Sequence, residues 1–182
     1  MKSNMETNPY DPSRVDGRAP VSPVPVGGVR TLQIITFAMA SGVAVFAAFV
    51  LWTEKLAFDG EPNVLCWIAL GFAAITFLLS LIVPRISVGI AMKRIAADGV
   101  TDEQEQGQKL FPLYQTSHII ACAFLESAAF ANLIAYMQSH FVGSIAAGAV
   151  LIGLILIRFP TEYGAENWIS NRVQDLRAGR LS

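Results

Sequence analysis

Seven polar side chains lie inside one long apolar stretch of the sequence, and three of them are candidates for chemistry. Residues 113–137 are mostly Ala, Leu, Ile and Phe, yet they include His118, Glu126 and Asn132. A carboxylate at the centre of a bilayer costs at least about 2.5 kcal/mol, so a membrane segment should turn Glu126 towards protein or water. No Lys or Arg lies inside the apolar stretches before Arg158. Since burial without a counter-charge favours the neutral form, we expect Glu126 to be protonated or to bind a cation.

Two interpretations of these residues stay open. Steps of three and four residues place seven side chains on one helical stripe: Tyr114, His118, Cys122, Glu126, Ala129, Asn132 and Tyr136. In the first interpretation, protons or cations pass between His118 and Glu126, which lie about 12 Å apart along the axis. In the second, a neutral Glu126 forms an interhelical hydrogen bond and Asn132 joins two helices; candidate partners of Glu126 are Ser41, Thr76 and Ser80.

Other chemical motifs are missing from the sequence. It contains no HExxH, GxSxG, Walker or CxxC motif, and its two histidines and two cysteines are dispersed. We therefore expect neither catalytic residues nor a cofactor nor a metal site. The formal net charge of −1 gives no reason to expect nucleic acid as a partner.

The surrounding elements must be membrane helices. Apolar residues make up 53% of the chain and charged residues 15%, against about 25% charged in a soluble domain. Charge is nearly absent from four stretches, residues 31–52, 64–83, 113–137 and 141–159. As helices these reach roughly 28–38 Å, enough for a hydrocarbon core of about 30 Å. The sequence predicts four transmembrane helices that form two successive hairpins in a lipid bilayer.

The distribution of basic residues predicts the orientation. Of 13 Lys and Arg residues, only Lys55 falls in the links after the first and third stretches. All others lie before the first stretch, in the link 84–112, or from Arg158 onwards. The positive-inside rule then places both termini in the cytoplasm, with the chain in the cytoplasmic (inner) membrane.

The segments outside the four stretches have their own patterns. Residues 1–30 are rich in proline and predict a disordered cytoplasmic tail. In the link, Ile86, Ile90 and Ile95 alternate with basic residues, which predicts an amphipathic helix on the inner membrane surface. Residues 160–182 predict a second such helix, capped by Thr161. Trp168 and Arg158 are the expected interfacial anchors.

Small residues recur every fourth position in two of the stretches. The repeats contain Ala40, Ala44 and Ala48 in the first stretch, and Gly143, Ala147, Gly148 and Gly153 in the fourth. Such patterns let helix backbones approach closely, either within one chain or in a homo-oligomer or membrane complex. The expected fold is an all-α four-helix membrane bundle with two amphipathic helices on the cytoplasmic surface.

Residues 123–136, Ala-Phe-Leu-Glu-Ser-Ala-Ala-Phe-Ala-Asn-Leu-Ile-Ala-Tyr, are similar to a stretch in small uncharacterised four-span bacterial membrane proteins. They also resemble the proteolipid c subunits of rotary ATPases, which are hairpins with an ion-carrying carboxyl at mid-membrane. That resemblance implies an ion-carrying role for Glu126. Two features depart from it: Glu126 is on the first helix of its hairpin rather than the second, and the dense glycine repeat of the proteolipid is missing.

Two functions follow from these patterns. The chain is expected to be a non-enzymatic packing or accessory subunit of a membrane assembly, in which Glu126 has a structural role. The alternative is a protein that moves or senses protons or cations through the Glu126 carboxyl.

Overall fold

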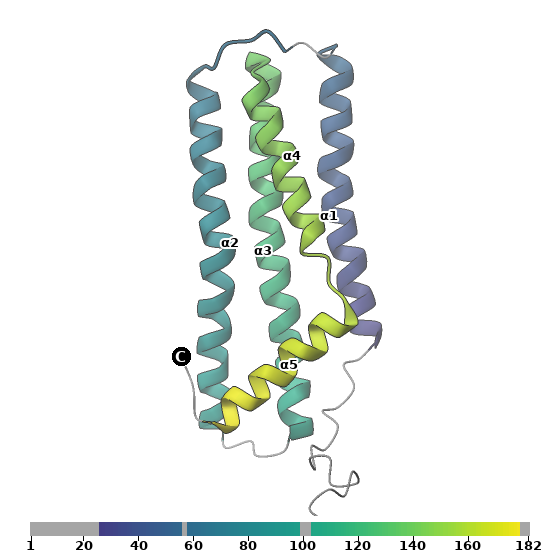
Figure 1. Cartoon of the computed structure of the whole chain (residues 1–182), viewed down its shortest axis with the longest axis vertical. Coiled ribbons are helices and arrows are strands. Elements are labelled where there is room, and N and C mark those ends of the chain that lie inside the picture. The colour runs from purple at the N-terminus through teal and green to yellow at the C-terminus, as the bar shows by residue number, and fades with distance from the viewer. Residues whose placement is uncertain (1–25, 56–57, 99–102, 179–182) are drawn as a thin grey trace, which may run out of the picture.

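The structure is a computed structural model that describes residues 26–55, 58–98 and 103–178. This part of the chain forms five helices and no strand: α1 (Val26–Thr53), α2 (Val64–Ala97), α3 (Glu103–Ser139), α4 (Val142–Ile157) and α5 (Glu162–Arg177) (Figure 1). The predicted all-α class is confirmed. The predicted disordered tail, residues 1–30, lies outside the described residues except for 26–30, which begin α1.

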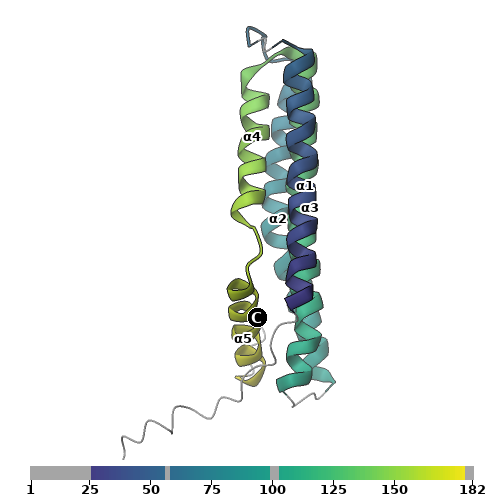
Figure 2. The same cartoon turned by 90° about the vertical axis from the view of Figure 1, so that its right-hand side faces the viewer.

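Helix α3 is the centre of the bundle. It packs against each of the other four helices, and most extensively against α2. Helices α1 and α2 lie on either side of α3 (Figure 1), and α4 covers one face of the layer that these three helices form (Figure 2). No helix covers the opposite face of this layer in the part of the chain that the structure describes.

The chain has three or four candidate membrane spans. Helices α1, α2 and α3 are each long and apolar enough to cross a bilayer. Helix α4 has only 16 residues and qualifies only together with α5, from which it is bent by 72°. Multiple spans are therefore supported, and the predicted fourth span, residues 141–159, corresponds to this shorter helix.

The two internal prolines do not end the helices. We expected the second span to stop at residue 83 and the third to start at 113, but α2 continues through Pro84 to Ala97 and α3 begins at Glu103, before Pro112. Proline removes one backbone hydrogen bond, and in membrane helices this loss is tolerated where neighbouring helices support the segment. The separate amphipathic helix predicted after Pro84 is therefore wrong, because its residues extend α2.

The bundle has two main apolar cores. We call the first the α5-end core: Val29, Val88, Met92, Ile95, Leu110, Phe111, Ala165, Ile169 and Val173. The second, the membrane-depth core, joins α1, α3 and α4: Ala40, Val43, Cys122, Leu125, Ala128, Ala129, Leu133, Leu151 and Ile155. The α5-end core lies where α1 and α3 begin, where α2 ends, and where α5 crosses them (Figure 1).

Helix α5 buries its apolar face against protein. Ala165, Ile169 and Val173 are each at most 2% exposed. Thr161 caps the helix as predicted, because its hydroxyl oxygen accepts a hydrogen bond from the Gly164 amide at 3.1 Å. The amphipathic helix predicted over residues 160–182 corresponds to α5, whose most buried apolar residues pack on protein, and its contact with lipid stays a prediction. The extensions of α2 and α3 provide the apolar surface against which it packs.

The lengths of α2 and α3 explain why a second apolar core exists at the α5 end. Helices α2 and α3 have 34 and 37 residues. They therefore measure about 51 and 56 Å, compared with about 30 Å for the hydrocarbon core. A hydrocarbon core level with the turns at the far end of the bundle would leave about 21 Å of α2 and about 26 Å of α3 beyond it. The α5-end core lies in this extension.

Candidate functional site: polar groups at membrane depth

Glu126 lies on α3, beside Gly42 of α1. Its side chain is half-buried, and Oε1 is 4.0 Å from the position that a Cβ on Gly42 would take. No hydrogen bond or ion pair joins Glu126 to any residue in the described ranges. Thr76 and Ser80, two of its candidate partners, instead donate to Phe72 O at 2.8 Å and Phe77 O at 2.7 Å within α2.

His118 is held between α3 and α1, away from Glu126. Its Nε2 lies 3.0 Å from Thr36 Oγ1 and 3.5 Å from Cys122 Sγ. The Thr36 hydroxyl donates to Leu32 O at 2.9 Å, so its oxygen is left to accept from the imidazole. We therefore assign the proton to Nε2. This hydrogen bond fixes the ring in a packing position and makes no link to Glu126.

Asn132 joins α3 to α2. Its side chain is fully buried, and Nδ2 donates to Ala69 O of α2 at 3.2 Å and to Ala128 O at 2.9 Å. The Oδ1 atom has no partner among the described residues. The contacts fit the predicted role of an interhelical hydrogen bond, while ion binding by Asn132 stays a prediction.

The small residues divide between the interior and the surface. Ala40 and Gly148 are buried, and Gly148 lies 3.5 Å, measured from the Cβ position, from the Leu133 side chain. Ala44 and Ala48 are exposed, and a Cβ at Gly153 would meet nothing within 4 Å. Gly143 and Ala147 are half-buried. The repeat in each helix thus supplies some residues to the bundle and leaves others facing outwards.

The two predicted anchors lie near the α5 end. Trp168 is half-buried against the α5-end core, with its ring centroid 5.4 Å from that of Tyr114 and 5.6 Å from the Arg172 guanidinium. Arg158 is half-buried at the end of α4. Trp168 therefore packs mainly on protein, and the interfacial role of both residues stays a prediction.

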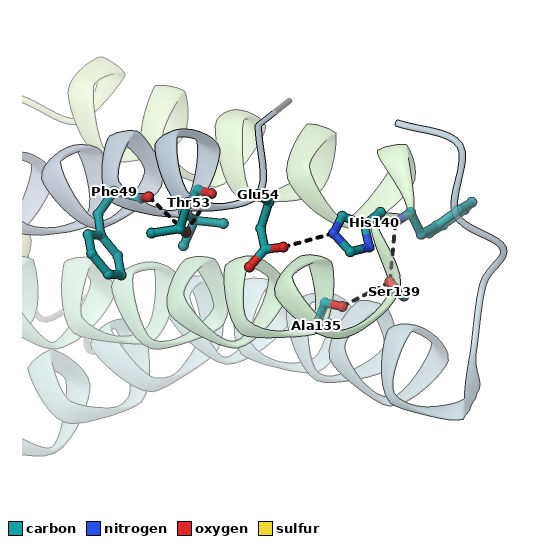
Figure 3. Close-up of polar contacts among 8 residues, drawn as sticks. Phe49, Thr53, Glu54, Ala135, Ser139 and His140 are labelled. Atoms are coloured by element: carbon teal, nitrogen blue, oxygen red, sulfur yellow. Dashed lines mark hydrogen bonds and ion pairs between the residues drawn. The ribbon is translucent and has the colours of Figure 1, made fainter. Parts of the chain in front are cut away.

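A hydrogen bond between a carboxylate and an imidazole at the opposite end of the bundle was not predicted; it is an ion pair when the imidazole is protonated. Glu54, just after α1, meets His140, just after α3, with Oε2 and Nε2 2.8 Å apart (Figure 3). The His140 backbone has a φ of 53° and its amide donates to Tyr136 O, which ends α3. Next to it, the Ser139 hydroxyl donates to Ala135 O and lies 2.9 Å from Cys66 Sγ of α2. These contacts tie three helices together.

No sequence pattern predicts the contact between Glu54 and His140, because the two residues are 86 positions apart. A charged residue just after an apolar stretch is ordinary, and only the parallel course of α1 and α3 brings these two together. Within the described ranges, no group of three or more His, Cys, Asp or Glu side chains is placed to hold a metal ion.

Of the three candidate ion-binding residues, Glu126 is thus the one that is half-buried and has no side-chain partner among the described residues.

Comparison with protein families, curated proteins and solved structures finds no match to this chain.

The surroundings of Glu126 differ from the other outward surfaces. The exposed residues of α3 from position 113 onwards form what we call the open face: Thr116, Ala123, Ser127, Ile134 and Gln138. Its side chains are mostly small or polar, and Gly42 of α1 continues it beyond Glu126. The exposed residues of α2 at similar depth include large apolar side chains, Phe72, Ile75, Leu78 and Ile82, with the small Gly71 and Ala74 between them. Lipid suits the second surface better than the first.

Proposed function

We propose that this chain is a non-enzymatic packing or accessory subunit of a larger assembly in the cytoplasmic membrane. The observation that supports this proposal is the half-buried Glu126 carboxyl, which has no hydrogen-bond partner in the described residues and borders the open face. A polar group in that position is costly in lipid. A neighbouring membrane protein that covers the open face would supply both its hydrogen bond and its shielding.

The orientation in this proposal has both termini in the cytoplasm. The bundle end that contains α5 has nearly all described basic residues: Arg30, Arg85, Lys93, Arg94, Lys109, Arg158 and Arg172. The opposite end has Lys55. This separation supports placing the α5 end on the cytoplasmic side.

Translocation of protons or cations through Glu126 is the weaker candidate. The expected relay residue, His118, is hydrogen-bonded to Thr36. Glu126 lies towards the outside of the bundle rather than along an internal path. Both observations favour a contact role for the carboxyl.

The test compares wild type with Glu126→Gln and Glu126→Ala in native membranes. After mild solubilisation, wild type should migrate in a complex well above its 19.7 kDa chain mass. The amide variant should keep most of the complex, because an amide also donates and accepts hydrogen bonds, and the alanine variant should lose most of it. All three purified proteins should show no proton flux in proteoliposomes. Flux that wild type has and Glu126→Gln lacks would instead favour translocation.

A further inference from the structure

An arginine without a counter-ion lies where α4 ends and the chain bends by 72° towards α5. Arg158 is half-buried, and its charge acts on His118 and Cys122 of α3, which places it one to two helical turns from Glu126 on the α5 side. It forms no ion pair or side-chain hydrogen bond with any residue in the described ranges. A guanidinium that is partly withdrawn from water requires an anion or several acceptors for its five N–H donors.

A second arginine without an ion pair borders the same place. Gln33 of α1 donates from Nε2 to Pro160 O at 3.0 Å, and this bond holds the start of α1 against the segment between α4 and α5. Arg30 lies one turn before Gln33, is exposed, and has no ion-pair partner among the described residues. Glu162, in the first turn of α5, is exposed and bonded to neither arginine. We call Arg30, Arg158 and the Gln33–Pro160 contact beside them the α4–α5 junction, which has an excess of positive charge.

The bilayer brings one kind of anion to the depth of this junction. Helix α4 begins at the turn after α3, and its 16 residues measure about 24 Å, so Arg158 lies near the far edge of a hydrocarbon core of about 30 Å. Ile34 of α1 and Ile157 of α4 are 63% and 82% exposed close to the two arginines along their helices, which suits acyl chains rather than water. A lipid whose chains lie on these helices has its phosphate at the level of the arginines. Guanidinium groups bind phosphate oxygens through pairs of N–H donors.

We propose that the α4–α5 junction binds the headgroup phosphate of an anionic glycerophospholipid through Arg158 and Arg30. An anionic headgroup fits better than a zwitterionic one, because the excess positive charge of the junction repels a cationic amine. The short α4 creates the site, since a longer helix would carry its terminal arginine past the phosphate layer. This inference goes beyond the accessory role and does not depend on it, because it requires only that the bundle lies in a bilayer.

The test is lipid retention by the purified full-length chain. The protein is equilibrated in detergent micelles with equal amounts of phosphatidylglycerol and phosphatidylcholine that have the same acyl chains, and bound lipid is counted by native mass spectrometry. We expect wild type to retain about tenfold more phosphatidylglycerol, and Arg158→Gln and Arg30→Gln each to lower this preference about fivefold or to abolish it. The matched control is Arg94→Gln, which removes an exposed arginine in the last turn of α2 that also lacks an ion pair among the described residues. This variant should retain lipid like wild type.

Two further measurements keep the test decisive. Circular dichroism shows whether Arg158→Gln keeps its helices, and if it does not, the exposed Arg30→Gln decides by the same criterion. An excess of inorganic phosphate is added to wild type, and the bound lipid should stay. Equal retention of the two lipids by wild type, or an equal loss in Arg94→Gln and in the junction variants, would overturn the inference, since the latter shows only a general attraction of positive charge. Displacement of the lipid by inorganic phosphate would also overturn it, in favour of a site for the free anion.

Discussion

The α5 end and the membrane-depth part of the bundle differ in how completely neighbouring helices cover their apolar surfaces. At the α5 end, α1, α2, α3 and α5 share one core, in which Ala165, Ile169 and Val173 of α5 are each at most 2% exposed. At membrane depth, α4 covers one face of α3, and the other face is open. Water penalises exposed apolar surface, whereas lipid penalises only polar groups. The bundle is closed where water is expected to surround it, and its open region is costly only at Glu126.

The largest expected effect concerns the closed end. Ile169→Ala removes a side chain that is 2% exposed in the α5-end core. Such a truncation costs about 2–5 kcal/mol. Hydrogen exchange of the α5 amides should therefore speed up by a factor of about 30 or more, since 1.4 kcal/mol corresponds to tenfold. The control is Glu166→Ala, at an exposed position of α5, which should change exchange little. Unchanged exchange in Ile169→Ala would show that α5 is not held by this core.

The next effect has the opposite sign and concerns the open region. Glu126→Leu removes the unpartnered carboxyl, so the isolated monomer should gain about 1–2.5 kcal/mol of unfolding free energy. Denaturant unfolding in bicelles at high dilution measures this gain. A loss of stability would mean that the monomer itself uses the carboxyl, contrary to its lack of partners in the described residues.

A smaller loss is expected inside the bundle at similar depth. Asn132→Ala removes the hydrogen bond to Ala69 O, and such interhelical bonds contribute about 0.6 kcal/mol on average and at most about 1.7 kcal/mol. The control is Ser127→Ala on the same helix, whose hydroxyl bonds only to its own backbone turn among the described contacts. If both variants lose equal stability in the bicelle assay, the α2–α3 bond does not contribute.

The smallest effect is expected for Glu54 and His140. Both side chains are partly exposed, so a double-mutant cycle with Glu54→Gln and His140→Gln should give a coupling of about 0.2–1 kcal/mol. The coupling should decrease further in high salt, because exposed pairs are screened. A coupling that does not respond to salt would argue that this end of the bundle is shielded from water.

The sequence predicts well what depends on local composition. Long apolar stretches without charge indicate the helices, and the position of Glu126 within its stretch indicates its depth. The prolines were misleading, since whether Pro84 ends a helix depends on the neighbours that support the residues after it. The packing of α5 on protein could not be predicted either, because an amphipathic pattern is the same whether the apolar face contacts lipid or protein.

The candidate site was predicted only in part. Helical spacing placed His118 and Glu126 on one stripe, but their surroundings depend on the neighbouring helix at each level. His118 meets Thr36, whereas Glu126 meets the glycine Gly42, which offers no hydrogen-bonding side chain. The Glu54–His140 pair had no local signal, because it depends on how the ends of two helices meet.

The shortness of α4 has a consequence for the bilayer itself. Its 16 residues measure about 24 Å, several ångströms less than a typical hydrocarbon thickness of about 30 Å. The 72° bend before α5 prevents that helix from lengthening the span. Lipid beside α4 therefore has to thin locally, or the whole bundle has to tilt, whereas the longer α2 exceeds the thickness. This hydrophobic mismatch would favour thin membranes and would draw shorter-chain lipids to the α4 side of the protein.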